Sequence, residues 1–339
     1  MKREAMLYEK LDDKRVHCFL CAHECKITNH RFGICNVRQN IEGELYTLVY
    51  AQAIAANIDP IEKKPLYHFL PGSNSYSIAT MGCNFRCGFC QNWQISQVLK
   101  KNGVISTGYG LVPRQVVEEA KKHNCRSISY TYTEPTIFFE YAHDTARLAK
   151  KVGLFNVFVT NGYMTKQALE TINPFLDAAN VDLKSFSEAY YKRNCKARLQ
   201  PVLDSIVYMK ELNIWVELTT LIIPSLNDSE DNLRQIACFI AQELGVCTPW
   251  HISRFYPTYE LGHLPQTPIE ALHKARDIGL QAGLRYVYIG NVPESDGANT
   301  YCYDCGTLLI HRYSNTLLEN KIVDGHCYHC GAEIDGVGI

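Results

Sequence analysis

Features that would direct this chain to a membrane or to nucleic acid are missing from its sequence. It has no run of about 18 apolar residues, the length that spans a bilayer as a helix. Residues 1–5 lack the apolar segment of a signal peptide. Lysine and arginine number 34 against 35 aspartates and glutamates, so the formal net charge of −1 gives no bulk attraction to nucleic acid or an anionic membrane. We therefore expect a soluble, cytoplasmic protein.

Cysteine, by contrast, is abundant: the 339 residues include 15 cysteines. A disulfide scaffold is the usual explanation in a short secreted chain, but this chain is long and carries no secretion signal. In a reducing compartment, clustered cysteines are more often metal ligands. Eleven of the cysteines fall into three clusters, at residues 18–35, 83–90 and 302–330.

The middle cluster has three cysteines, Cys83, Cys87 and Cys90, in a C-x3-C-x2-C spacing. Four thiolates close the coordination of a [4Fe-4S] cluster or a structural zinc, whereas three leave one metal position open for a chelating small molecule. Phe89 places an aromatic ring beside that position. The alternative is a zinc knuckle whose fourth ligand lies elsewhere in the chain.

The two outer clusters each have four cysteines. Cys18, Cys21, Cys25 and Cys35 have a spacing that fits either a structural zinc or a second iron–sulfur cluster. Cys302, Cys305, Cys327 and Cys330 form two C-x2-C-G knuckles, the pattern of a zinc ribbon. A rubredoxin-like iron is the smaller possibility there.

Between these outer clusters, short β-rich runs alternate with amphipathic helical patterns. The expected strands are 76–80, 127–132, 155–160, 179–184, 214–220, 249–254 and 285–290. Such alternation implies a parallel sheet, and no G-x-G-x-x-G follows the first strand to favour a doubly wound one. We predict an α/β fold, a partial parallel (β/α)6-type TIM-like barrel with an N-terminal cysteine-rich module and a C-terminal zinc-ribbon-like module. The expected parts are 1–72 (cysteine module and connector), 73–295 (core barrel) and 296–339 (C-terminal module).

Polar residues follow six successive predicted strands whose bodies are apolar. The ends of parallel strands meet at one rim, so these side chains should converge with the cysteine loop. Asparagine, aspartate, glycine and threonine also serve turns and helix caps, so residues that do not act as caps weigh most. Those are Glu134, Lys184, His251 and Arg254.

These motifs together resemble the radical S-adenosylmethionine (SAM) superfamily, in its pyruvate formate-lyase activating-enzyme-like branch. Beside the cysteine loop, the resemblance rests on the segments 132–135, 160–162, 182–184, 221–224 and 250–257. Within that branch the chain is most similar to the radical SAM enzyme of the AmmeMemoRadiSam system, through the N-terminal cysteine quartet, the connector 59–72 and the core motifs.

The resemblance implies a role for each site residue. Cys83, Cys87 and Cys90 would ligate a [4Fe-4S] cluster, with Phe89 beside the adenine of SAM. Glu134 would bind the SAM amino group, and the SAM pocket would be completed by Asn161, Asp182, Lys184 and His251. The chain departs from the family where Tyr132 and Thr133 replace two glycines, which leaves the contacts to the methionine moiety open.

The activity implied is the reductive cleavage of SAM to methionine and a 5′-deoxyadenosyl radical that abstracts hydrogen from a substrate, under anaerobic conditions. Memo-family and AMMECR-family proteins are the implied partners, and a low-potential donor such as ferredoxin or flavodoxin would supply electrons. One alternative is an activase of a glycyl radical enzyme. A second, of another class, is a zinc-ribbon module that binds RNA or protein, and a third is a radical SAM enzyme that modifies RNA; the neutral net charge argues against nucleic acid.

Overall fold

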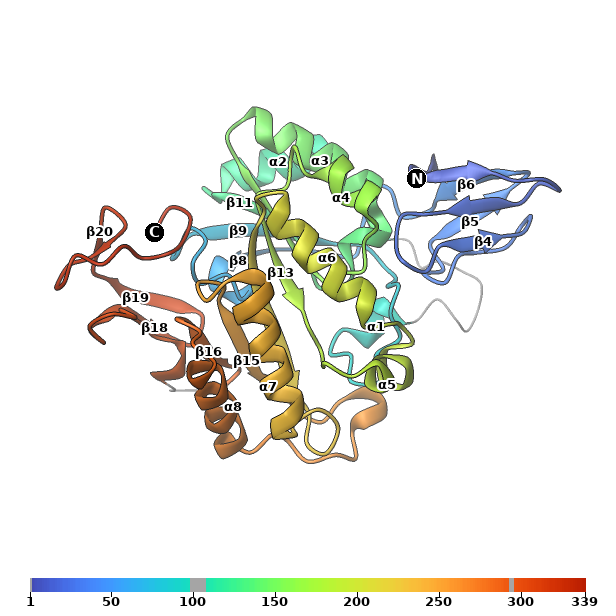
Figure 1. Ribbon diagram of the computed structural model, residues 1–339. Helices are drawn as coiled ribbons and strands as arrows, with labels where there is room; N and C mark the ends of the chain where they lie inside the picture. The colour runs from blue at the N-terminus through green and yellow to red at the C-terminus, as the bar shows by residue number, and fades with distance from the viewer. Residues whose placement is uncertain (1, 98–107, 293–295) are drawn as a thin grey trace.

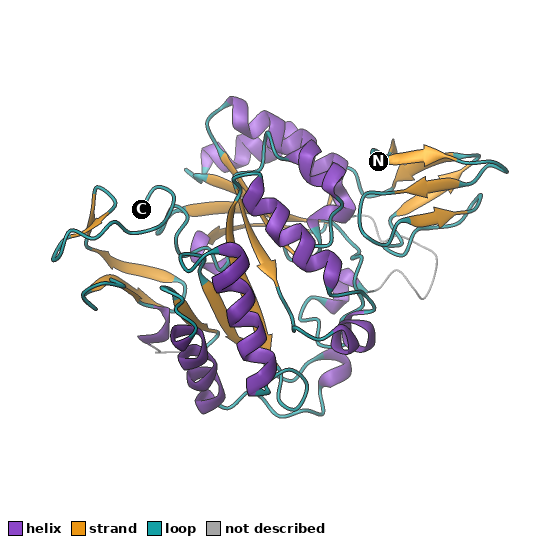
Figure 2. Ribbon diagram, in the orientation of Figure 1, coloured by secondary structure: helices purple, strands orange, loops and turns teal. Residues whose placement is uncertain are grey.

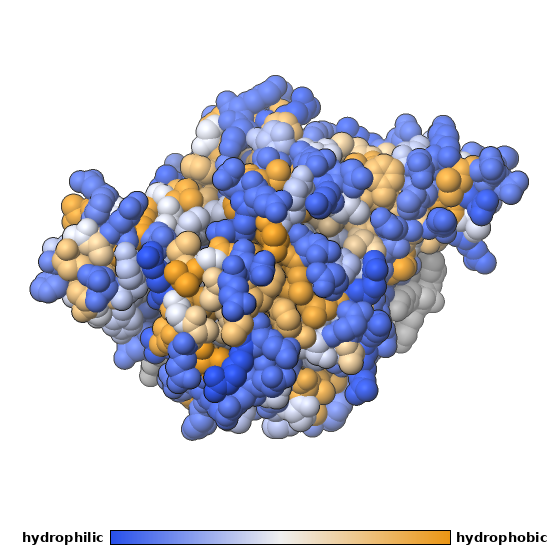
Figure 3. Space-filling model, viewed as in Figure 1, coloured by the Kyte–Doolittle hydropathy of each residue, from blue (hydrophilic) through white to orange (hydrophobic). Residues whose placement is uncertain are grey.

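The computed structural model describes residues 2–97, 108–292 and 296–339. A central α/β unit carries a small β-rich module on either side, with the N-terminal module and the C-terminal module at opposite ends of the molecule (Figure 1). No helix in the described part of the chain is both long and apolar enough to cross a bilayer. Hydrophilic residues predominate on the face shown in Figure 3, with hydrophobic residues gathered towards its middle.

An eight-stranded sheet forms the central unit, in the order β16-β15-β14-β13-β12-β11-β9-β8. Every neighbouring pair is parallel except β8 and β9, which are antiparallel. The bodies of the parallel strands are largely buried, as expected where helices cover a parallel sheet, whereas β8 at the antiparallel edge is partly exposed. The strands are β8 (Ala55–Pro60), β9 (Asn74–Ala79), β11 (Ser127–Tyr130), β12 (Phe155–Thr160), β13 (Ala178–Asp182), β14 (Trp215–Ile222), β15 (Trp250–Arg254) and β16 (Val287–Gly290).

The helices that join these strands lie along the outside of the sheet (Figure 2). Their apolar faces pack on it, and their polar faces meet solvent. They are α1 (Trp93–Ser96), α2 (Pro113–Lys122), α3 (Phe139–Lys151), α4 (Lys166–Ile172), α5 (Glu188–Tyr190), α6 (Gln200–Glu211), α7 (Glu230–Phe239) and α8 (Ile269–Gln281). Helices α5 and α7 each continue for five residues with π-helical geometry, at 191–195 and 240–244.

Two three-stranded antiparallel sheets build the N-terminal module, in the orders β1-β6-β5 and β2-β3-β4. A short antiparallel pair joins β7 (Gln52–Ala53), which follows the module in the chain, to β10 (Tyr109–Gly110). The module's strands are β1 (Arg3–Glu4), β2 (Tyr8–Lys10), β3 (Val16–Cys18), β4 (Cys25–Ile27), β5 (Arg38–Ile41) and β6 (Glu44–Thr47).

The C-terminal module is a three-stranded sheet, β17-β18-β19, followed by a small hairpin, β20-β21. Its own core is small and includes Cys302, Leu309, Ile310, Cys327 and Ile334. Its strands are β17 (Thr300–Tyr301), β18 (Leu308–Tyr313), β19 (Thr316–Asn320), β20 (Ile322–Val323) and β21 (His326–Cys327).

The expected α/β architecture with a mostly parallel sheet is confirmed, and all seven expected strands are present within a few residues of their predicted bounds. The closure of that sheet into a partial barrel stays a prediction. The sheet also begins earlier than the expected core, because β8 lies in the region 1–72. The predicted end of the core, at residue 295, lies outside the described residues.

The start of α8 has no side-chain cap. The segment that opens α8 predicts a threonine cap with proline at the first helical position. In the structure Pro268 itself is the cap residue, and no side chain caps the helix. The Thr267 hydroxyl instead donates to the Ile222 carbonyl at 2.6 Å and accepts from the Phe255 amide at 2.9 Å, so it joins two loops at the ends of β14 and β15.

Candidate active site

The cysteine loop follows β9 directly and is held from both sides by backbone contacts. The Gly82 amide donates to the Ile95 carbonyl at 2.9 Å, and the Arg86 amide donates to the Cys195 carbonyl at 2.9 Å. Cys83 and Cys87 are buried, and Cys90 is partly exposed. The loop is therefore a fixed element of the core, with its thiols turned inward.

Two cavities that share a wall lie against this loop. The smaller, the cysteine cavity, has a volume of about 250 Å³ and is lined by all three thiols of the loop together with Phe89, Asn161, Asp182 and Lys184. The larger, the central cavity, has a volume of about 900 Å³ and reaches His251 and Tyr256. Asn92, Asn161 and Asp182 are among the residues that line both cavities, so the two form a continuous recess.

Lys184 and Asp182 form an ion pair in the floor of the cysteine cavity. The Lys184 Nζ lies 2.9 Å from the Asp182 Oδ2, and it is 5.9 Å from the centre of the Phe89 ring. Burial disfavours the charged ammonium, but Asp182 and the thiols of Cys87 and Cys195 raise the pKa of Lys184 well above its ordinary value. The cavity therefore holds a fixed positive charge beside a half-exposed carboxylate.

Asn161 bridges the cysteine loop and the end of β12. Its Nδ2 lies 3.5 Å from the Cys83 Sγ and 3.2 Å from the Asn84 Oδ1. The Phe85 amide donates to the same sulfur at 3.3 Å. Burial, together with the nearby Glu134 charge, raises the pKa of Cys83, so its thiolate forms only with a bound cation to offset those costs.

Glu134 lies behind the wall of the cysteine cavity. Its Oε1 accepts from the Thr136 amide at 3.0 Å, from the Thr136 hydroxyl at 2.5 Å and from the Thr160 hydroxyl at 2.7 Å. Its Oε2 accepts from the Asn161 amide at 2.7 Å. A carboxylate has about four acceptor sites, two on each oxygen, so these donors saturate Oε1 and leave one site on Oε2. The contacts favour a positioning role for Glu134, and its predicted bond to the SAM amino group stays a prediction.

His251 lies deeper, in the wall of the central cavity. Its Nε2 is 2.7 Å from the Glu217 Oε2, and its ring stacks on Tyr288 with 5.2 Å between ring centres. Glu217 also accepts from the backbone amides of Tyr67 and His68 at 3.0 and 2.8 Å. Burial opposes its charge, but these donors and His251 keep the pKa of Glu217 below its ordinary value. Glu217 thus fixes the orientation of the imidazole.

Arg254 takes a different position from the one expected. Its Nε donates to the Thr267 carbonyl at 2.8 Å, and its guanidinium lies over the Tyr256 ring. Among the described residues that line the two cavities, Arg254 does not appear. Of the two cations at the ends of predicted strands, Lys184 and Arg254, the structure brings only Lys184 into the cavity lined by the thiols.

Tyr132, where the sequence resemblance predicts a glycine, adopts a backbone conformation that favours glycine. Its φ is 62°, in the left-handed region that glycine adopts most easily. Its carbonyl accepts from the Asn92 Nδ2 at 2.8 Å, and the Thr133 hydroxyl donates to the Thr80 carbonyl at 2.8 Å. The substituted turn is therefore tied to both flanks of the cysteine loop.

The C-terminal cysteines are gathered tightly. The Sγ atoms of Cys302 and Cys330 are 3.6 Å apart, those of Cys305 and Cys327 are 3.7 Å apart, and all four lie within 4.8 Å of one another. Hydrogen bonds from Thr307 lower the pKa of Cys305 to about 6, which favours a thiolate there. This quartet could hold one metal ion.

The N-terminal cysteines converge more loosely. Cys18 and Cys25 are opposite each other in the β3–β4 ladder, and the thiols of Cys21 and Cys35 are close enough for their charges to interact with both. Burial is the main reason why the pKa of Cys25 rises to about 11, and the neighbouring thiols add to it. Among the described residues, no three of these thiols lie within 4.8 Å of one another.

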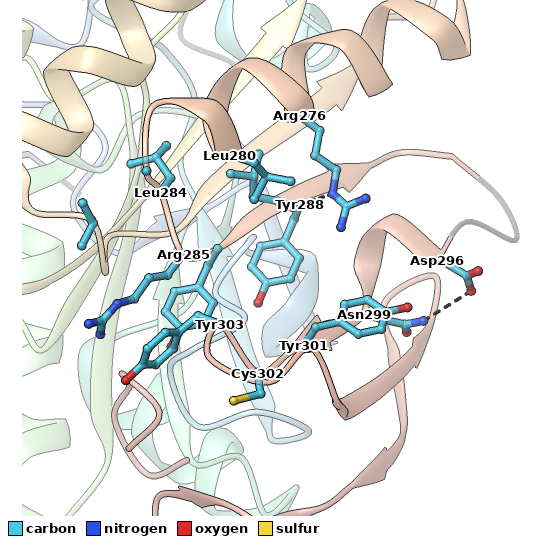
Figure 4. A pocket seen from close by; sticks show the side chains of 15 residues that line it. Arg276, Leu280, Leu284, Arg285, Tyr288, Asp296, Asn299, Tyr301, Cys302 and Tyr303 are labelled. Carbon is cyan, nitrogen blue, oxygen red and sulfur yellow. Dashed lines mark hydrogen bonds between the residues drawn. The ribbon is translucent and has the colours of Figure 1, made fainter. Parts of the chain in front are cut away.

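A further cavity, of about 690 Å³, lies away from the cysteine loop, between α8 and the C-terminal module (Figure 4). Arg276, Arg285 and Tyr303 are among its lining side chains, and Cys302 lies at its edge. Arg285 forms an ion pair with Asp335 at 2.8 Å and lies over the Tyr303 ring at 3.9 Å. Arg285 therefore helps to join the module to the core, whereas the Arg276 Nε donates to the carbonyl of Val287 within the core, at 3.3 Å.

Several residues of the site were not foreseen from the sequence. Glu217 gave one signal, a glutamate in the body of an otherwise apolar strand. Cys195 stands outside a clear apolar pattern in the sequence, which favours a packed or idle thiol over a reactive one; in the structure its thiol contacts that of Cys87 and is the first cause of the raised pKa there. The tip of the β18–β19 hairpin gave no signal, although Tyr313, Ser314 and Asn315 line the central cavity. These contacts join residues far apart in the chain.

The donor set of the loop fits a [4Fe-4S] cluster. The loop offers three thiols, those of Cys83, Cys87 and Cys90. Their sulfur atoms do not all lie within 4.8 Å of one another, whereas the four C-terminal sulfur atoms do. That wider spacing suits thiolates that each bind a different iron. The fourth iron position would face the cysteine cavity, where Asn161, Asp182 and Lys184 supply polar groups.

Comparisons with known proteins agree with this geometry. The family model of the Radical SAM superfamily matches residues 77–237. The "Uncharacterized protein MJ0808" of Methanocaldococcus jannaschii is 47% identical over 335 residues, which cover 98% of this chain and 99% of that protein. The "Putative glycyl-radical enzyme activating enzyme MJ1227" of the same organism is 26% identical, over 66% of this chain and 89% of that protein. A radical SAM methyltransferase from Sphaerobacter thermophilus shares the fold, with a TM-score of 0.52, 15% identity and 71% of each chain covered.

Proposed function

This chain belongs to the radical SAM superfamily, whose members are enzymes that bind SAM and an iron–sulfur cluster, and we propose that Cys83, Cys87 and Cys90 are its cluster ligands. The observation that carries the proposal is the opening of three thiols of one loop onto a polar recess. A [4Fe-4S] cluster held there supplies the electron that cleaves SAM to methionine and a 5′-deoxyadenosyl radical, which abstracts hydrogen from a substrate.

The chain's own side chains suit the binding of SAM beside that loop. The ammonium of Lys184 would attract the SAM carboxylate, and Phe89 would offer its ring to the adenine. Asp182 and the more distant His251 would accept or donate hydrogen bonds at the ribose. The carboxylate of Glu134 fixes the backbone of Asn161, and so aligns the wall along which SAM would lie.

We propose a small-molecule substrate, within the AmmeMemo system, that occupies the central cavity. Support comes from the enclosure of that cavity, because the connector at Lys63–Pro65 and the hairpin tip at Ser314–Asn315 both line it. Its volume of about 900 Å³ lies in the range of small-ligand sites. Strands from β11 to β16 and the connector after β8 face the same cavity, which supports the proposal that the sheet curves as a partial barrel.

An activase of a glycyl radical enzyme is the second candidate. The observation in its favour is the similarity to relatives named as glycyl-radical enzyme activating enzymes, such as the Methanocaldococcus jannaschii protein MJ1227. An activase must admit a loop of a large partner protein to the radical. The hairpin tip at Ser314–Asn315, in the wall of the central cavity, opposes this unless the C-terminal module moves.

Two further assignments are proposals that each have one supporting observation. Memo-family and AMMECR-family partners, and a ferredoxin or flavodoxin donor, are supported by the sequence resemblance alone. Zinc in the C-terminal quartet is supported by its sulfur spacing, since four thiolates about 2.3 Å from one zinc lie about 3.8 Å apart, close to the 3.6 and 3.7 Å found.

A hydrogen-transfer experiment tests the substrate. The enzyme, prepared without oxygen, is given SAM, a reductant and a deuterated small-molecule extract. Deuterium in the 5′-deoxyadenosine produced supports the small-molecule proposal. No deuterium transfer, together with a glycyl radical EPR signal on an added partner protein, contradicts it and favours the activase. The C83A/C87A/C90A triple variant, which should lack both the brown colour and the cleavage product, is the negative control.

A further inference from the structure

The β3–β4 ladder and the turn that follows β4 bring the four N-terminal cysteines together. Cys18 and Cys25 face each other in adjacent strands, in register. A Cβ placed on Gly33 would lie 3.8 Å from the Sγ atoms of both Cys25 and Cys35. The absence of a side chain at Gly33 therefore leaves space beside two of the thiols, bordered also by the Ile27 Cδ1, which is 3.3 Å from that Cβ position.

The spacing of these thiols differs from that of the C-terminal quartet in the same molecule. A single tetrahedral zinc draws its four sulfurs to about 3.8 Å from one another. The C-terminal sulfurs meet that spacing, at 3.6 and 3.7 Å. Within the described residues, no three N-terminal thiols lie even within 4.8 Å of one another, and the same is true of Cys83, Cys87 and Cys90. The N-terminal quartet therefore shares the wider spacing of the loop.

A buried cation faces the N-terminal quartet. The side chain of Arg38 is 1% exposed, and its Nη1 lies 3.1 Å from the Cys18 Sγ. Its Nη2 is paired with Glu140, which is itself buried. Hydrogen bonds to sulfur ligands and nearby charge stabilise the anionic charge of an iron–sulfur cluster and set its potential.

The quartet also lies directly against the cysteine loop of the core. The His23 Nε2 is 2.8 Å from the carbonyl oxygen of Asn84, the residue after Cys83. The Arg86 guanidinium donates to the carbonyl of Ile34, the residue before Cys35. Cys21 forms a β-bridge with Met164, next to the segment that carries Asn161.

We propose that Cys18, Cys21, Cys25 and Cys35 hold a second iron–sulfur cluster of the [4Fe-4S] class, adjacent to the cluster of the core loop. Four thiolates complete its coordination, so this cluster binds no SAM. This site is separate from the proposed SAM-cleaving site. The proposal of a second cluster therefore does not depend on whether the chain cleaves SAM.

Metal analysis of the triple variant C83A/C87A/C90A tests this inference. Protein reconstituted without oxygen should contain about eight iron and eight sulfide per chain in the wild type, and about four of each in the variant, given four irons per cluster. The variant loses SAM cleavage in either case, so the metal count is independent of activity. A variant without iron, with or without a second zinc per chain, would overturn the proposal.

A spectroscopic measurement gives a second readout that leaves the N-terminal quartet unsubstituted. Two reduced clusters side by side broaden each other's EPR signals. The reduced wild-type protein should therefore show a broader spectrum than the triple variant, whose N-terminal cluster is alone. If the wild-type spectrum is a single narrow signal that disappears in the triple variant, the quartet holds no such cluster.

Discussion

At the scale of single residues, the sulfurs of the core loop depend on donors that come from other elements. The side-chain amide of Asn161, at the end of β12, lies 3.5 Å from the Cys83 Sγ. A donor near a cluster sulfur stabilises the reduced state, which carries the larger negative charge.

The variant N161A should therefore lower the reduction potential of the core cluster. A hydrogen bond worth about 1 kcal/mol corresponds to roughly 40 mV in a one-electron couple. An EPR-monitored redox titration measures the shift. Q235A, at an exposed position on α7, is the control and should leave the potential unchanged; an equal potential in N161A would contradict the assigned contact.

Which residues meet at the rim could be predicted from the sequence only in part. Asn161, Asp182 and Lys184 were foreseen because the carboxyl ends of parallel strands share one edge. The roles of Glu134 and Arg254 depend on their immediate contacts, with Thr136, Thr160 and Thr267, and no pattern in the sequence reports which way a side chain turns.

His68 gives a pH dependence at the residue scale. Burial lowers its pKa to about 4, whereas the imidazole of an unfolded chain has a pKa of about 6.5. Between these values the unfolded chain binds a proton that the folded chain does not. The free energy of unfolding should therefore fall as the pH drops from about 6.5 towards 4, by up to about 3 kcal/mol.

Urea unfolding at several pH values measures this dependence. In the variant H68Q, which has no imidazole at this position, the fall between pH 6.5 and 4 should be smaller than in the wild type. H263Q, at an exposed position, should follow the wild type. A fall of the same size in H68Q would show that another group is responsible.

At the scale of elements, the strands are predicted well because they are buried apolar runs, while the turns between them are not. The turn after β12 illustrates the difference. Gly162 has a φ of +64°, and a Cβ there would lie 2.6 Å from the Val181 Cγ1. The sequence shows a glycine but not the neighbouring strand that requires it.

The variants G162A and G153A separate the cost of a left-handed backbone from the cost of close packing against the neighbouring strand. Both glycines have positive φ, +64° and +77°, but Gly153 has nothing within 4 Å of an added Cβ. G153A should cost about 1 kcal/mol in the free energy of unfolding, for the left-handed backbone alone. G162A should cost about 3 kcal/mol, because it also overpacks the core against β13. Equal losses in chemical denaturation would contradict the close packing.

At the scale of the whole molecule, a buried arginine, Arg312, is one of the residues that fix the C-terminal module to the core. Arg312 donates to the Tyr67 carbonyl at 2.9 Å, and its Nε lies 3.6 Å from the Glu62 Oε1. Arg312 and Tyr67 are 245 residues apart in the chain, which is why no local pattern predicts their contact. The same docking brings the β18–β19 hairpin tip to the central cavity.

Removing that guanidinium should loosen the module. The variant R312M leaves Glu62 buried without its partner, which typically costs 3–5 kcal/mol. The combined variant E62Q/R312M should recover part of the loss. Hydrogen exchange at residues 300–339 measures the effect, with K321M, at an exposed ion pair, as control. Unchanged exchange in R312M would mean that other contacts hold the module.

The central claim is that the core loop assembles a cluster that cleaves SAM. The most direct test measures 5′-deoxyadenosine and methionine formed from SAM and dithionite by the anaerobically reconstituted protein. We predict product from the wild type and from C238S, at an exposed lone cysteine, and none from C87S, whose thiol lies in the loop. Cleavage by C87S at the wild-type rate, or no cleavage by iron-loaded wild type, would contradict the account.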